Sequence, residues 1–81
     1  MRNENPENYP MISVNGNDWR IYIDQISHRE IACIADYSDY DGVSVTYKNG
    51  PPDNPEGILY PYKSVKVTNG MVFRAIRTGN S

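Results

Sequence analysis

The sequence predicts one small α+β domain, in which a single helix packs across one face of a four- to five-stranded mixed sheet. Its 81 residues are few for two domains. The apolar residues fall mostly in short alternating runs separated by Gly, Pro, Asn and Asp, which is typical of strands joined by turns. One segment, ISHREIACIADY, instead carries apolar residues at helical spacing.

The first alternating run, residues 11–23, predicts two strands joined by a tight turn. We expect a two-residue turn at Gly16 and Asn17, with glycine in the first position. This register sets Val14 opposite Trp19 and gathers the large apolar side chains on one face of the hairpin.

Three signals predict that a helix begins after Ser27. Ser27 suits the N-cap, Glu30 completes a capping box, and Ile26 is placed to pack against Ile31 across the first turn. We expect about ten helical residues. The predicted buried stripe is Ile31, Ile34 and Ala35.

The only cysteine and the only histidine both lie in this helical segment. A single cysteine excludes an internal disulfide and is typical of a reducing, cytoplasmic location, and we expect Cys33 to be a small core residue. His28 lies about 500° away around the helix, on a different face, which argues against a catalytic Cys-His pair.

The second half of the chain predicts a third strand at residues 43–47, a proline-rich connection with a short edge piece at 58–60, and a final hairpin. A three-residue loop, Thr68 to Gly70, would pair Val67 with Met71 and Val65 with Phe73. In this register Met71, Phe73 and Ala75 point inward, and Val72, Arg74 and Ile76 point outward.

Composition excludes several functional classes. The formal net charge is −2 and the sequence has no basic stripe, so we expect no nucleic acid as a partner. No apolar run approaches the length of a bilayer span, so we expect no membrane as a partner either. Asp39, Asp41 and Gly42 resemble part of a calcium loop, but the closing Glu is missing. No paired carboxylates, metal ligands or phosphate loop have supporting context. We therefore expect no catalytic residue, no metal and no cofactor, and the protein is predicted not to be an enzyme.

The order strand, strand, helix, strand, short strand and hairpin is that of the β-grasp fold. In such a sheet the first and last strands lie side by side as a parallel pair, and the last strand is central. The predicted organisation is a flexible arm at 1–10, which contains Tyr9, the domain at 11–77, and a C-terminal tail at 78–81.

Several segments also carry a family resemblance: SHREIACIA, VSVTYKNG, SVKVTNGMVF and the closing RTGNS. Residues 11–81 resemble the prokaryotic ubiquitin-like proteins of the multiubiquitin-domain type, found beside bacterial ubiquitin-activating, ubiquitin-conjugating and JAB-peptidase-like enzymes. The resemblance implies a protein modifier whose terminal glycine carboxylate is adenylated, moved to an enzyme cysteine and then joined to an amine as an isopeptide.

On this resemblance Gly79 is the conjugated residue. The tail must thread a narrow channel, and a residue without Cβ allows close approach by the nucleotide and the enzyme cysteine. Asn80 and Ser81 would then be removed by a JAB-type peptidase. The implied partners are an E1-like activating enzyme and an E2-like conjugating enzyme, with protein targets unknown.

The predicted partner-binding residues are those of the last strand and its exit: Val72, Arg74, Ile76, Arg77 and Thr78. Arg74 and Arg77 would supply charged contacts to the activating enzyme. A sulfur carrier is disfavoured because such chains finish at Gly-Gly. The alternative from another class is a non-covalent assembly or adaptor module, a homo-oligomer formed when the arm docks on a neighbouring copy.

Overall fold

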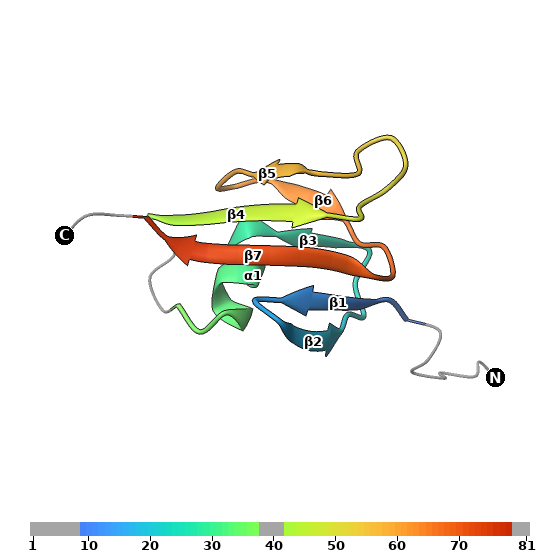
Figure 1. Ribbon diagram of the computed structural model, residues 1–81, viewed down its shortest axis with the longest axis horizontal. Coiled ribbons are helices and arrows are strands. Elements are labelled where there is room, and N and C mark those ends of the chain that lie inside the picture. Colours follow the sequence, from blue (N-terminus) through green and yellow to red (C-terminus); the bar gives the residue numbers. More distant parts are fainter. Residues whose placement is uncertain (1–8, 38–41, 79–81) are drawn as a thin grey trace.

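The computed structural model describes residues 9–37 and 42–78. Within these ranges the chain forms seven strands and one helix (Figure 1). In order they are β1 (Met11–Val14), β2 (Asn17–Arg20), β3 (Gln25–Ser27), α1 (His28–Ile34), β4 (Val43–Lys48), β5 (Gly57–Leu59), β6 (Ser64–Lys66) and β7 (Met71–Arg77).

Five of the strands form one mixed sheet in the order β2-β1-β7-β4-β5. Strand β7 is central and runs parallel to β1 on one side and antiparallel to β4 on the other (Figure 1). The predicted parallel pairing of the first and last strands is therefore confirmed. Because β7 has neighbours on both sides, the C-terminal segment leaves from the middle of the sheet.

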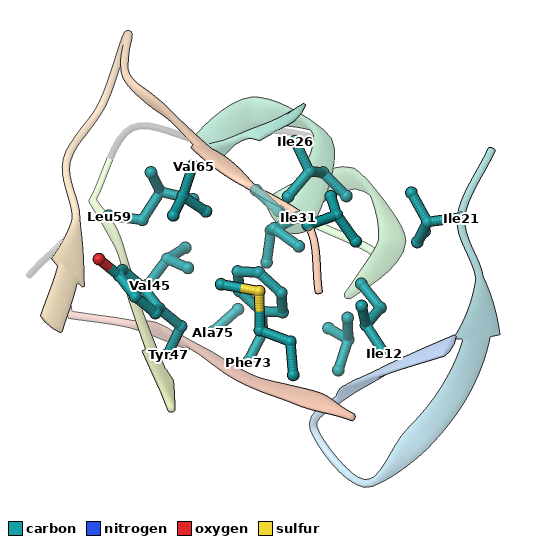
Figure 2. Close-up of a cluster of buried hydrophobic side chains, with 14 of the residues drawn as sticks. Ile12, Ile21, Ile26, Ile31, Val45, Tyr47, Leu59, Val65, Phe73 and Ala75 are labelled. Atoms are coloured by element: carbon teal, nitrogen blue, oxygen red, sulfur yellow. The ribbon is translucent and has the colours of Figure 1, made fainter. Parts of the chain in front are cut away.

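The core fills the space between this sheet on one side and α1 with the small β3-β6 sheet on the other. Figure 2 shows Phe73 and Val45 of the large sheet pointing toward Ile31 of α1 and Val65 of β6. All four side chains are buried. One helix across one face of a five-stranded mixed sheet is the arrangement of a single β-grasp domain, as predicted.

The first hairpin differs from its predicted register. Its turn is Asn15-Gly16, with φ of +52° and +88°, so Ile12 lies opposite Trp19 and Val14 opposite Asn17. Asparagine and glycine both tolerate positive φ, and their succession gives the turn that best matches strand twist. The slip is two residues, so the same side chains still face the core, although Trp19 remains 44% exposed.

The start of α1 is confirmed in detail. The Ser27 Oγ accepts from the Glu30 backbone N–H at 3.1 Å, and the Glu30 carboxylate accepts from the Ser27 N–H at 2.8 Å. The helix is shorter than predicted, because it ends at Ile34 and Asp36 already has a φ of +72°.

The helix buries a different stripe from the one expected. His28, Ile31 and Ala32 are buried, Ile34 is only partly buried, and Cys33 is exposed, so its prediction as a core residue is wrong. The helix begins beside β4, where the His28 Nε2–H donates to the Val43 carbonyl oxygen at 2.7 Å. His28 therefore lies on the inward face of the helix, and Cys33 lies on the outward face.

The predicted final hairpin is also wrong in its pairing. Strand β6 pairs antiparallel with β3, which sets Val65 opposite Ile26 rather than Phe73. Only the turn itself holds, with Gly70 at φ +87° and the Met71 N–H donating to the Thr68 carbonyl. The expected alternation along β7 is confirmed: Met71, Phe73 and Ala75 are buried, and Val72, Arg74 and Ile76 are exposed.

The connections complete the domain. Strand β5 lies at the sheet edge as expected, where Leu59 is buried while Tyr60 is exposed. Tyr9 and Pro10, assigned to the arm from sequence, contact β2 and its end: Arg20 donates to the Tyr9 carbonyl and the Ile21 N–H to that of Pro10. The possible calcium ligands Asp39 and Asp41 lie outside the described residues. The helix found in the described ranges is neither long nor apolar enough to cross a membrane.

Candidate functional site

The sheet has an outer face, opposite the helix, onto which β7, β4 and β5 project alternate side chains. Cross-strand registers place Arg74 beside Thr46 and Thr46 beside Ile58, and they place Ile76 beside Ser44. We call the outward residues of β7, β4 and β5 the outer face. They are Ser44, Thr46, Lys48, Ile58, Val72, Arg74 and Ile76.

The outer face combines exposed aliphatic side chains with positive charge. Val72, Ile76 and Ile58 are 40%, 43% and 52% exposed, and the charged members are Arg74 and Lys48. None of the seven outer-face residues, all of them in the described part of the chain, is acidic. The chain as a whole carries a charge of −2. These three strands therefore present a locally cationic part of the sheet, next to which the outward residues of β1 and β2 include Ser13 and the acidic Asp18. This part suits a partner surface that offers carboxylates beside apolar groups.

Three of the five predicted partner-binding residues come together here, and Arg77 and Thr78 do not. Val72, Arg74 and Ile76 share the outer face, whereas Arg77 belongs to the opposite face of β7, where its guanidinium carbon lies 5.4 Å from the centre of the Tyr37 ring. This is cation–π geometry, so Arg77 is tied to the segment that follows α1. The structure therefore places the two arginines on opposite faces of β7.

Thr78 holds the chain just beyond the end of β7. Its backbone N–H donates to the Gly42 carbonyl oxygen at 2.6 Å, and its hydroxyl donates to the same oxygen at 3.1 Å. Gly42 precedes β4 and has a φ of +78°. The last described residue is therefore fixed on the β4 side of the sheet, one position before Gly79.

Asn15 holds β7 on the other side. Its side-chain Oδ1 accepts from the Ala75 N–H at 2.8 Å, and its Nδ2 donates to the Ala75 carbonyl at 3.0 Å. Asn15, Gly16 and the β7 residues 72–76 line a groove of about 480 Å³ beside the outer face. The C-terminal half of β7 is thus held up to Ala75 on the β1 side, and the chain is held up to Thr78 on the β4 side.

Gly79, Asn80 and Ser81 lie outside the described residues, so the predicted conjugation and processing positions carry no geometry here. In the described ranges, no group of three or more His, Cys, Asp and Glu side chains is arranged to hold a metal ion.

Sequence reasoning missed Asn15, Gly42 and Tyr37 as contacts of the C-terminal segment. Asn15 had a signal, because Asn-Gly between alternating apolar residues is the strongest short-range hairpin cue. That cue locates the turn but gives no hint that the amide bonds Ala75, a residue 60 positions away. Comparison of the chain with protein-family models, curated proteins and solved structures found no match.

Proposed function

We propose that this protein is a ubiquitin-like modifier of the prokaryotic multiubiquitin-domain type, joined to amines through Gly79. The observation that carries the proposal is the placement of β7. It is the central strand, it is anchored on both sides, and Thr78, the residue after it and the last one described, directly precedes Gly79. A rigid domain thereby delivers a short C-terminal segment.

The chemistry requires a processed end. A JAB-type peptidase removes Asn80 and Ser81, and the exposed Gly79 carboxylate becomes the reacting group. An E1-like enzyme joins that carboxylate to the α-phosphate of ATP with release of pyrophosphate, and the enzyme's cysteine thiolate then displaces AMP to form a thioester. After transfer to an E2-like enzyme, an amine attacks the thioester carbonyl, the thiolate leaves, and an isopeptide remains. Glycine suits every step, because no Cβ obstructs the approach of nucleotide or cysteine.

The outer face supplies recognition. Val72 and Ile76 offer apolar area, and Arg74 between them can form bidentate hydrogen bonds with a partner carboxylate. Arg77 is expected to act differently, since its stacking on Tyr37 stabilises the base of the C-terminal segment. In the proposed division of roles, the outer face docks and the residues beyond Arg77 enter the enzyme.

The test is reconstitution with an E1-like activating enzyme, an E2-like conjugating enzyme and a JAB-type peptidase of the multiubiquitin-domain type. We expect thioester on the activating enzyme, and adducts on amines, from the wild-type chain and from a chain truncated after Gly79. The Gly79→Ala variant is expected to lose both products, whereas the matched control Asn80→Ala should retain them. Equal conjugation by Gly79→Ala would contradict the proposal.

A second candidate is a non-covalent adaptor, and the cationic, aliphatic outer face is the observation that favours it. Such a module would bind its partner with unchanged affinity after Gly79→Ala. A modifier would still bind its activating enzyme through the outer face, but it would form no thioester. Thioester formation by the wild-type chain therefore separates the two functions: a modifier forms the thioester and loses it in Gly79→Ala, whereas an adaptor forms none although both proteins bind.

A further inference from the structure

Strand β1 ends before its neighbour β7 does. Val14, the last residue of β1, pairs with Phe73, whereas β7 continues to Arg77. Backbone N–H and C=O groups are obligatory hydrogen-bonding groups, and those of Ala75 face the side where β1 has stopped. A strand edge of this kind must be satisfied by a side chain, water or another chain.

The Asn15 side chain takes the place of the missing strand residue. A primary amide carries one carbonyl acceptor and an N–H donor, the same pair that a peptide group presents. The Asn15 side chain makes both hydrogen bonds to the one residue Ala75: it accepts from the Ala75 N–H at 2.8 Å and donates to the Ala75 carbonyl at 3.0 Å. The parallel ladder is thus extended by one step without any further strand.

The amide of Asn15 is itself fixed in place. The backbone N–H of Asn15 donates to the Phe73 carbonyl at 3.0 Å, and a φ of +52° places Asn15 at the first position of the turn. Asparagine is one of few residues other than glycine that adopt this conformation readily. The side chain is therefore presented to Ala75 by a turn that is already anchored to β7.

We propose that Asn15 is a positioning residue for the C-terminal segment. It keeps β7 in line up to Ala75 on the β1 side, while β4 and Gly42 hold the other side up to Thr78. The chain then leaves the sheet at a fixed place and direction. This inference rests on the proposed function, because the segment so positioned is the one that leads to Gly79.

In the proposed function, the activating enzyme binds the outer face but reacts with the C-terminal segment, so loosening that segment is expected to affect catalysis rather than binding. When the outer face is bound, the enzyme must also receive residues beyond Arg77 in one geometry. A loose β7 would dock equally well but reach the reacting geometry less often, which is an orientation effect. Loss of the Asn15 amide should therefore lower kcat and leave KM unchanged.

The chain offers a matched pair of variants. Asn15→Gly removes the side-chain amide, and because glycine tolerates the positive φ, the turn is kept. The control is Asn49→Gly: Asn49 has a φ of +60° and its Nδ2 donates to the Gly70 carbonyl at 3.3 Å, just before β7 begins. It makes the same chemical change without touching Ala75. Asn15→Asp retains the acceptor for the Ala75 N–H and loses the donor.

The first measurement is amide hydrogen exchange by NMR on the full chain. We expect Ala75 to exchange about tenfold faster in Asn15→Gly, as for the loss of roughly one hydrogen bond, and to change by less than about twofold in Asn49→Gly. Asn15→Asp should fall between Asn15→Gly and the wild type. Unchanged exchange at Ala75 in Asn15→Gly would overturn the inference.

The second measurement is steady-state thioester formation with the activating enzyme. Asn15→Gly is expected to lower kcat about fivefold at constant KM, and Asn15→Asp to recover part of the loss. An unchanged kcat despite faster exchange would overturn the positioning role. If the wild-type chain forms no thioester, the proposed function fails, and the exchange comparison alone decides whether Asn15 holds β7.

Discussion

Tyr62 occupies a backbone conformation that suits glycine. It has a φ of +67° in the turn closed by the Lys63 N–H and the Tyr60 carbonyl, and its side chain is 89% exposed. The position after Pro61 is the one that favours glycine in a type II turn. A bulky residue there costs about 1–2 kcal/mol, while the exposed ring gains little from burial.

We predict that Tyr62→Gly stabilises the domain by about 0.5–1 kcal/mol, the relief of strain less the entropy that glycine adds to the unfolded chain. Urea unfolding of the two proteins measures the difference. Tyr60→Gly is the control, since Tyr60 has no positive φ and its replacement should not stabilise. A less stable Tyr62→Gly protein would mean that the ring makes a contact worth more than the strain.

His28 is a buried core residue whose side chain makes a hydrogen bond. It is 1% exposed, its Nε2–H donates to the Val43 carbonyl, and its Nδ1 has no hydrogen-bond partner within the described ranges. We predict that His28→Ala costs about 2–4 kcal/mol, because it leaves a cavity and an unpaired carbonyl. His28→Gln, which retains a donor, should lose less. Equal losses in denaturant unfolding would show that only volume matters.

At the scale of elements, the capping box fixes where α1 begins. We predict that Ser27→Ala lowers the free energy of unfolding by about 1 kcal/mol, since it removes the acceptor for the Glu30 N–H. Ser64→Ala is a matched control, because Ser64 lies directly opposite Ser27 in the β3-β6 pair but caps no helix. Thermal or urea unfolding compares the two, and equal losses would argue that the cap contributes nothing.

Strand β7 gives the element-scale prediction for recognition. Val72→Thr with Ile76→Thr keeps β-branched side chains and should change stability by less than about 0.5 kcal/mol per site. It removes apolar contact area, so we expect KM for the activating enzyme to rise about tenfold or more. Ile23→Thr is the control, an isoleucine of similar exposure located between β2 and β3. An unchanged KM in the double variant would place recognition elsewhere.

Local chemistry explains which elements could be predicted from sequence. The helix start, the third strand and the alternation along β7 follow from capping residues and the two-residue period, and the structure has all three. The partner of β6 could not be predicted the same way. Val65 can pair opposite Phe73 or opposite Ile26 without any change in the alternating pattern, and only the tertiary structure selects β3 as the partner of β6.

The same limit applies to the candidate site. Val72, Arg74 and Ile76 were found because alternation alone turns them outward. Arg77 was grouped with Arg74, although its contact with Tyr37 depends on where the chain passes after α1. The Asn15–Ala75 bonds depend on a parallel pairing between opposite ends of the chain. Such contacts follow from tertiary structure and leave no local signal.

At the scale of the whole molecule, the proposed function requires a rigid sheet that is joined to a short reactive C-terminal end. The outer face and the C-terminal segment belong to the same strand, so docking at one places the other. Asn15, Gly42 and Tyr37 anchor that strand at or near its end. The central claim is that Gly79 becomes the mature end and is joined to amines.

The most direct test is tryptic mass spectrometry of conjugates formed with the E1-like, E2-like and JAB-type enzymes of the reconstitution. Trypsin cleaves after Arg77, so an acceptor lysine modified through Gly79 retains the dipeptide Thr78-Gly79. We predict that this remnant appears on target lysines and disappears in Gly79→Ala. Lysines that carry Thr78 through Ser81, or no modified lysine in the presence of active enzymes, would contradict the account.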